Sequence, residues 1–318
     1  MTRLCFKLFL LIVAMSVLQT ALGYFFTLPQ ISVVDKLLKN DCGVMYLGDS
    51  SVTNLAVSDT DRATLPEIVL RMNPGLSVCD GSHPAYSTPM FEYVLDYISR
   101  QTNKPNAVII PINLRSFSPE WDMRPEYQFE KEKFYFTAQS RLFSAWYRPL
   151  AIFRVLKVNT ISQERYLKTP VFDGREQIGT MADFFDEKKF SSTTPENIRA
   201  KYVVKYMGAI KKEDENILSL GRALDIANRA GIRAYVYITP VDYEGGEKYV
   251  GEYFKKQIRE NVAMVCKAVE EKNIDCIDLS EGVPRSGFDF GSYPNEHLNE
   301  TGRLFVAEKV SEMLRGGE

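Results

Sequence analysis

The sequence is poor in the residues on which metal and cofactor sites depend. Its 318 residues include two histidines and five cysteines, and they contain no Cys-x-x-Cys motif or His/Cys cluster of the kind that binds zinc. A Gly-rich phosphate loop and a dinucleotide-binding fingerprint are both missing. We therefore expect neither a metal nor a cofactor.

An excess of charge of one sign is also missing. The formal net charge is -2, and acidic and basic residues are interspersed along the chain. Without a basic face or an Arg-rich stripe, a nucleic-acid partner is not expected. Hydrophobic residues make up 45% of the chain, which is enough for the large core of one α/β domain or two smaller ones.

The N-terminus carries the one long apolar run. Arg3 and Lys7 precede an apolar stretch at 8–26, about the 20 residues needed to cross a bilayer, and the cations place the N-terminus in the cytoplasm. Three aromatic residues at 24–26 favour a membrane anchor over residues 1–27, whereas the tripeptide at 21–23 also fits a signal-peptide cleavage site. Either way, we expect residues 28–318 outside the cytoplasm, as a periplasmic domain on a single-pass helix or as a secreted protein.

The cysteines allow two disulfides. Cys5 lies beside the apolar run, Cys42 and Cys79 sit at or near the first two predicted strands, and Cys266 and Cys276 flank a helix-to-strand connection. These two pairings fit an oxidising compartment, and buried free thiols are the alternative.

Short apolar segments alternate with helical patterns along most of the chain. Strands are predicted at 44–47, 76–79, 107–112, 233–238 and 274–279. Helices are predicted at 31–39, 64–72, 88–101, 216–230, 248–272 and 299–314. This alternation predicts an α/β fold, a five-stranded parallel sheet between two helical layers, whose functional sites lie beyond the carboxyl ends of the strands.

The alternation breaks at about 114–200. This stretch holds both tryptophans, Trp121 and Trp146, and many of the other aromatic residues. Because long structureless loops are unusual in a compact domain, we expect a helical, aromatic-rich insertion over the rim of the sheet, with one helix at 140–157. Its aromatics would stack on sugar rings or, more ordinarily, form the core of the insertion.

Polar residues and a glycine follow the predicted strands. Ser50, Gly81, Asn113 and Thr239 come soon after four of them, and His297 lies in the loop after the last. A serine nucleophile needs a base, and imidazole is the usual one near neutral pH. With so few histidines in the chain, Ser50 and His297 are predicted to form a catalytic pair.

Two motifs resemble those of the SGNH (GDSL-type) hydrolases. They are Gly48-Asp49-Ser50 after the first strand and His297-Leu298-Asn299 before the last helix, and the likeness covers about residues 43–118 and 230–315. It implies a flavodoxin-like sheet and no cofactor. With its N-terminal apolar run, the chain is similar to membrane-anchored members found in cell-envelope polysaccharide acylation loci.

The resemblance also implies a role for each site residue. Ser50 would be the nucleophile and His297 its base. The oxyanion hole would be formed by the backbone amides of Ser50 and Gly81 and the side-chain amide of Asn113, all aimed at the charge that develops in the transition state.

The third member of the triad departs from the family pattern. The family's aspartate stands three residues before the histidine, where this chain has Pro294. Asp289 and Glu296 are the nearest acids. Glu296 adjoins His297 and would point away from its ring, whereas Asp289 needs the loop to fold back. A dyad oriented by a backbone carbonyl is the third alternative.

These residues predict an extracytoplasmic serine esterase or O-acyltransferase. It would move an acyl group, by default acetyl, on a carbohydrate or cell-envelope polysaccharide through an acyl-Ser50 intermediate. Expected partners are that polysaccharide, the membrane through the N-terminal helix, and a membrane protein that donates the acyl group. The alternatives are a non-catalytic polysaccharide-binding or assembly protein, favoured by the missing aspartate, and a lipid-directed hydrolase, favoured by membrane proximity.

Overall fold

A computed structural model gives the fold. It describes residues 2–25, 29–118, 120–121, 124–137, 164, 167–168, 170–172, 177–184, 194–289 and 294–316. The helix predicted at 140–157 and Trp146 lie outside the described residues.

The central sheet has five parallel strands in the order β2-β1-β3-β6-β7. They span Val44–Tyr46 (β1), Val78–Asp80 (β2), Ala107–Ile112 (β3), Arg233–Ile238 (β6) and Cys276–Asp278 (β7). All six residues of β3 are buried, because helices cover both faces of the sheet. The predicted strands and the parallel sheet are therefore confirmed.

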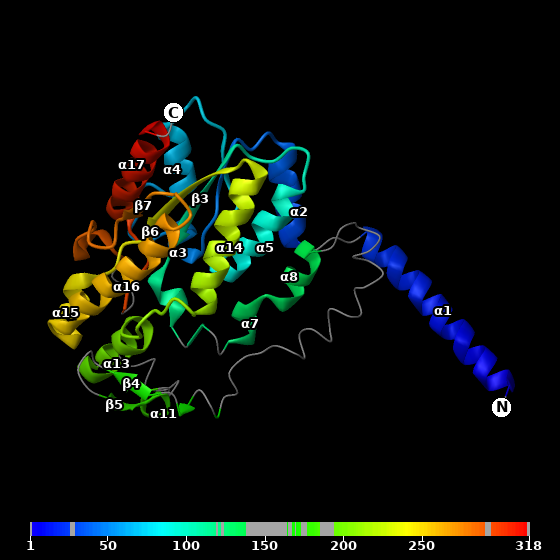
Figure 1. Ribbon diagram of the computed structural model, residues 1–318, viewed down its shortest axis with the longest axis horizontal. Coiled ribbons are helices and arrows are strands. Elements are labelled where there is room, and N and C mark those ends of the chain that lie inside the picture. Colours follow the sequence, from blue (N-terminus) through cyan, green and yellow to red (C-terminus); the bar gives the residue numbers. More distant parts are fainter. Residues whose placement is uncertain are drawn as a thin grey trace.

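Helices form a layer on each side of this sheet (Figure 1). One layer contains α2 (Pro29–Lys39), α5 (Thr88–Ser99), α14 (Glu215–Ala230) and α16 (Tyr253–Glu270). The opposite layer contains α4 (Leu65–Met72) and α17 (Glu300–Gly316). Successive strand residues alternate between the layers, so that Val108 packs with the first core and Ile109 with the second. The predicted three-layer arrangement is confirmed.

One predicted helix is two helices. The pattern at 248–272 predicts a single long helix, but α15 (Tyr243–Val250) ends at Gly251 before α16 begins. Gly251 has a φ of +101°, a conformation that side-chain-bearing residues rarely adopt, and its N–H bonds to the carbonyl of Glu247. The glycine therefore divides an otherwise continuous apolar pattern.

The described part of the insertion is largely helical. It contains a 3₁₀ turn η1 (Leu114–Phe117) and helices α7 (Pro125–Gln128), α8 (Glu130–Thr137), α11 (Met181–Phe184) and α13 (Pro195–Tyr206). It also contains a two-stranded antiparallel sheet, β4 (Pro170–Phe172) and β5 (Gln177–Thr180), that the aromatic pattern did not predict. The helix α13 contacts η1 at the rim of the main sheet, whereas α8 packs against α2 and α5.

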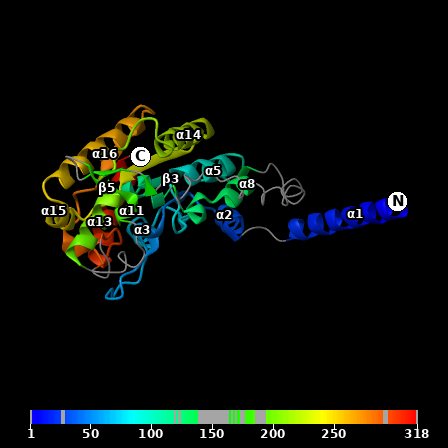
Figure 2. The same cartoon turned by 90° about the horizontal axis from the view of Figure 1, so that it is seen from below.

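The first helix, α1 (Thr2–Phe25), lies apart from these layers (Figures 1 and 2). It includes a segment at Arg3–Leu22 with a mean hydropathy of 2.0, none of which is buried. By length and composition this helix is able to cross a membrane, and an N-terminal signal sequence has the same character.

Both predicted disulfides are formed. Cys42 and Cys79 have Cα atoms 5.7 Å apart, and Cys266 and Cys276 have Cα atoms 5.2 Å apart. The first bond joins Cys42, just before β1, to Cys79 within β2, and the second ties α16 to β7. Cys5 is exposed and is the free cysteine of the chain.

Candidate active site

Ser50 and His297 meet at the carboxyl edge of the sheet. Ser50 begins the short helix α3 (Ser50–Thr53) after β1, and His297 lies between β7 and α17. The Oγ atom of Ser50 is 3.2 Å from Nε2 of His297. That separation suits proton transfer from the hydroxyl to the imidazole.

A sharp turn presents Ser50 at this edge. Gly48 has a φ of +153°, and a Cβ atom on it would lie 2.4 Å from Cγ2 of Val52, so a side chain has no room there. The carboxylate of Asp49 then caps α3 by accepting hydrogen bonds from the N–H (2.8 Å) and the hydroxyl (2.6 Å) of Ser51. As the first helical residue, Ser50 has a backbone N–H with no acceptor inside the helix.

Backbone pairing fixes the loop that carries His297. Phe288 and Leu298 form an antiparallel bridge, and the N–H of Asp289 donates to the carbonyl of His297 at 2.9 Å. At the other side of the residue, the N–H of His297 donates to Oδ1 of Asn295 at 3.1 Å. The loop therefore folds back on itself, as a role for Asp289 requires.

Asn54 is a site residue that the motifs did not reveal. Its Nδ2 atom lies 3.0 Å from Nε2 and 3.2 Å from Nδ1 of His297, so it faces the ring edge between the two nitrogens. Its backbone N–H bonds to the carbonyl of Ser50, one helical turn earlier. Asn54 lies four residues after Ser50, and residues at this spacing on a helix are neighbours, so the spacing is a sequence feature from which its position near the site could be predicted.

The surroundings of His297 favour its neutral form. Burial is the largest cause and lowers the pKa of the imidazole, and the positive charges of Arg115 and Lys205 act in the same direction. Asp49 and Asp289 oppose this shift, but the net result is a pKa below the ordinary 6.5. At neutral pH the ring is therefore in the form that accepts a proton.

This shift predicts the pH dependence of turnover. For the ester cleavage predicted from the sequence, measured on an aryl acetate, the acid limb of kcat/KM is expected to have its midpoint below pH 6.5, because the base must be neutral. Arg115→Met should move that limb to higher pH by removing a nearby positive charge. Initial rates between pH 4 and 9 in both proteins test this, and a wild-type midpoint above 6.5 would contradict the assignment of the base.

The backbone amide of Gly81, expected in the oxyanion hole, forms a hydrogen bond within the sheet. Its N–H donates to the carbonyl of Tyr46 at 2.8 Å, because the pairing between β1 and β2 continues one residue past β2. A Cβ atom at this position would lie 2.9 Å from the side chain of Met45, so packing against Met45 accounts for the glycine. This geometry corrects the expectation that the Gly81 amide is free to enter an oxyanion hole.

The side-chain amide of Asn113 also has hydrogen-bond partners in the structure. It follows β3 and is buried, and its Nδ2 atom donates to Oδ2 of Asp49 at 2.8 Å and to Oε2 of Glu296 at 3.3 Å. An amide nitrogen carries two hydrogens, so neither is left for a substrate oxygen in this arrangement. The side chain must release one carboxylate before it acts as an oxyanion donor.

Glu296 belongs to a buried ion pair. Its carboxylate is bound by the guanidinium of Arg115, and the side chains are 6% and 18% exposed respectively. Its Oε1 atom is 3.8 Å from Nε2 of His297, the nitrogen that faces Ser50. An acid that orients the base has to hold the other nitrogen, so Glu296 lies on the wrong side for that role.

Asp289 lies opposite His297 in the backbone pairing of the loop. It stands directly across from His297 beside the Phe288–Leu298 bridge, and residues opposite each other in an antiparallel pair share one face with Cβ atoms about 4.5–5.5 Å apart. Its charge raises the pKa of His297, as expected of a nearby carboxylate. This backbone register is the one that the predicted role of Asp289 requires.

The helix α13 carries a lysine whose charge acts on the site. Lys205 lies on α13, and burial, followed by the charge of Arg115, lowers the pKa of its ammonium group to about 7, against the effect of Glu120. Because it also lowers the pKa of His297, it lies within electrostatic range of the site. The motifs gave no sign of it, since α13 lies far along the chain from both.

Thr239, which follows a predicted strand, and the second histidine of the chain, His83, are both engaged in structural contacts. Thr239 is buried and its N–H donates to the carbonyl of Ile112 at 3.0 Å. His83 lies in the loop after β2, where its ring stacks on Tyr86 with centroids 4.6 Å apart. Across the described part of the chain, no cluster of three His, Cys, Asp or Glu side chains is placed to hold a metal ion.

The fold and site define an α/β protein with a serine–histidine pair at the carboxyl edge of a parallel sheet. No protein-family model matches the sequence, and no curated protein matches it either. Among solved structures, the chain is similar to an aryl esterase of M. smegmatis with a TM-score of 0.37 and 10% identity, over 86% of this chain and 98% of that one. A likeness of this size carries no inference about the reaction.

Proposed function

We propose that the protein is a serine esterase or O-acyltransferase. The single observation behind this proposal is the 3.2 Å approach of Ser50 Oγ to an imidazole whose pKa is lowered. The resemblance of the Gly48-Asp49-Ser50 and His297-Leu298-Asn299 motifs to SGNH hydrolases points to the same chemistry.

The reaction follows from the positions of these two groups. Ser50 Oγ attacks the carbonyl carbon of an ester while His297 Nε2 accepts the hydroxyl proton, and the backbone N–H of Ser50 faces the oxygen that becomes negative. His297 then gives the proton to the departing alkoxide, which leaves an acyl-Ser50. Water or a sugar hydroxyl attacks this acyl group through the same base, so hydrolysis and transfer differ only in the acceptor.

We extend the proposal to an extracytoplasmic carbohydrate or polysaccharide substrate carrying acetyl esters. Support comes from the apolar helix α1 with Arg3 at its start, and from two disulfides of the kind that persist in oxidising compartments. An anchored enzyme of this type would take its acyl group from a membrane protein when it acts as a transferase.

Covalent labelling tests the proposal. The full chain in detergent should react with a fluorophosphonate probe at Ser50, because His297 activates that hydroxyl. Ser50→Ala should not be labelled, whereas Ser82→Ala, which removes a hydroxyl after the neighbouring strand, should be labelled like wild type. Peptide mapping by mass spectrometry identifies the residue, and an unlabelled Ser50 contradicts the proposal.

The third residue has its own prediction. Asp289→Asn is expected to lower kcat by up to about 10⁴-fold, because the imidazole loses the group that fixes its orientation. Glu296→Gln should have a smaller effect, since that carboxylate binds Arg115 rather than the outer ring nitrogen. Steady-state kinetics on an aryl acetate compare the two, and an unchanged kcat in Asp289→Asn would show that the backbone alone orients the base.

One observation favours a second candidate function. The Gly81 amide bonds to Tyr46 and the Asn113 amide bonds to two carboxylates, so neither of these expected oxyanion donors is free. A protein that binds or assembles a polysaccharide on a hydrolase-like scaffold needs neither donor. It would bind the polymer while leaving the fluorophosphonate probe unreacted.

A further inference from the structure

Asn54 places a side-chain amide beside the ring nitrogen of His297 that faces Ser50. Its Nδ2 atom is 3.0 Å from Nε2 of His297, and Oγ of Ser50 is 3.2 Å from the same nitrogen. The amide and the hydroxyl therefore share one neighbour, the proposed base. Asn54 is exposed, so its side chain is open to a molecule that enters from solvent.

Contacts on both sides of Asn54 hold it in place. Its N–H donates to the carbonyl of Ser50 at 2.9 Å, because Asn54 is the residue that ends α3. Two residues later, the N–H of Ala56 donates to Oδ2 of Asp59 at 2.7 Å, and the same carboxylate is bound by the buried guanidinium of Arg303. A polar group that is fixed in advance needs little reorganisation to meet a reacting atom.

The side chain of Asn54 keeps hydrogen-bonding groups that the protein does not use. Its nitrogen carries two hydrogens, and a neutral imidazole offers one acceptor nitrogen, so at most one of these hydrogens is used by His297. Among the described residues, Oδ1 of Asn54 has no hydrogen-bond partner. The carboxamide therefore still offers one donor and one acceptor. Two adjacent hydroxyl groups of a sugar or another polyol match this pair.

The proposed reaction brings the alcohol oxygen of the ester to the same nitrogen. When an alkoxide leaves, its bond to the carbonyl carbon breaks and it takes the proton from Nε2 of His297. When an alcohol attacks acyl-Ser50, its oxygen bonds to that carbon and its proton passes to Nε2, which then returns a proton to Oγ of Ser50 as the acyl bond breaks. In both directions the oxygen lies about 2.6–3.2 Å from Nε2. On the solvent side of the ring, that position is also next to the amide of Asn54.

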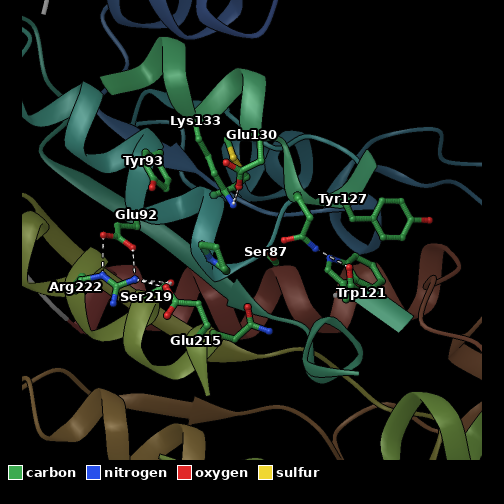
Figure 3. Close-up of a pocket in the computed structure, with 14 residues that line it drawn as sticks. Ser87, Glu92, Tyr93, Trp121, Tyr127, Glu130, Lys133, Glu215, Ser219 and Arg222 are labelled. Atoms are coloured by element: carbon green, nitrogen blue, oxygen red, sulfur yellow. Dashed lines mark hydrogen bonds and ion pairs between the residues drawn. The ribbon is translucent and has the colours of Figure 1, made fainter. Parts of the chain in front are cut away.

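A cavity between α5 and α14 is a separate feature. It measures about 390 Å³ (Figure 3), and Ser50, Asn54 and His297 are not among the described residues that line it. Its two cations, Arg222 and Lys133, form ion pairs with carboxylates of the same lining. A ligand in that cavity would not touch the reacting groups, so the alcohol part of a substrate belongs at Asn54.

We propose that Asn54 binds the alcohol part of the substrate and selects alcohols that carry a second hydroxyl group next to the reacting one. Nδ2 of Asn54 donates to the reacting oxygen, and Oδ1 accepts from the neighbouring hydroxyl. Asn54 is thereby a specificity-determining residue for the alcohol that leaves or receives the acyl group. The inference rests on the proposed function, because it assigns a role within the same reaction.

Two small esters of matched size test the proposal with the full chain in detergent. Ethylene glycol monoacetate has the second hydroxyl and propyl acetate lacks it, so wild type should cleave the glycol ester with the higher kcat/KM. Asn54→Ala should lower the ratio of the two kcat/KM values about tenfold, the size of one lost hydrogen bond. Asn54→Asp keeps an acceptor but loses the donor. It should preserve that ratio and lower kcat/KM for both alkyl esters relative to phenyl acetate, whose phenoxide needs less stabilisation.

A matched control and the adverse outcomes complete the design. Ser58→Ala removes an exposed hydroxyl from the same loop and should keep the wild-type ratio. The proposal is overturned if wild type does not prefer the glycol ester, or if Asn54→Ala leaves the ratio unchanged. It is also overturned if Asn54→Ala lowers turnover of all three esters equally and slows fluorophosphonate labelling to match, because Asn54 would then act only through His297. A wild-type Ser50 that is never labelled would instead remove the proposed function, and this inference with it.

Discussion

Ser50→Ala is expected to lower ester turnover by about 10⁶-fold, close to the rate without enzyme. The hydroxyl is the proposed attacking group, and its Oγ atom lies 3.2 Å from Nε2 of His297, the proposed base. Ser50 lies at the start of a helix on the rim of the sheet, and its side chain contacts the imidazole of His297. We therefore expect Ser50→Ala to fold like wild type. Equal urea midpoints for the two proteins would show that the loss is chemical.

His297→Ala should give a loss of the same size, and the double variant should be no worse than either single one. Residues that act as one unit are not additive, since removing either member disables the same step. The chain offers a matched control in His83, whose ring stacks on Tyr86 away from the pair, so His83→Ala should keep full turnover. Stopped assays with an aryl acetate measure all three, and additive losses in the double variant would refute a shared step.

The sheet was predictable because its strands are covered on both sides. Two strands match the structure residue for residue, at Ala107–Ile112 and Arg233–Ile238. Such strands read as continuous apolar runs, so local sequence alone identifies them. The edge strand predicted at 274–279 is observed over Cys276–Asp278. Because an edge strand pairs with one neighbour, its ends are less strictly defined by the apolar pattern.

The pairing of Ser50 with His297 was predictable from topology, but the fine geometry was not. Strand ends in a parallel sheet meet at one edge, which brings together residues that are far apart in sequence. The hydrogen bond from the Gly81 amide to Tyr46 forms because β1 and β2 stay paired for one residue beyond β2. How far two strands stay paired is set by contacts between distant parts of the chain. The fold-back of Asp289 onto His297 likewise depends on a backbone bridge that leaves no residue pattern.

A buried ion pair holds the two site loops together. Arg303 on α17 is fully buried, and its partner Asp59 has a side chain that is 1% exposed. The guanidinium donates to Oδ2 of Asp59 at 2.7 Å and to the carbonyls of Ala63, Asp61 and Leu298 at 3.1, 2.9 and 3.1 Å. It therefore ties the loop that follows α3 to the residue next to His297.

Asp59→Ala is expected to lower the free energy of unfolding by about 3–5 kcal/mol, because it leaves the Arg303 charge buried without its partner. Arg303→Met in the same chain should restore part of that loss by removing the charge as well. The exposed pair between Arg71 and Asp61 is a matched control: both side chains are about half exposed, so Arg71→Ala should destabilise the protein far less than Asp59→Ala does. Urea unfolding of the four proteins measures these differences. Equal losses in Asp59→Ala and Arg71→Ala would show that burial of the Arg303 pair does not hold the site loops in place.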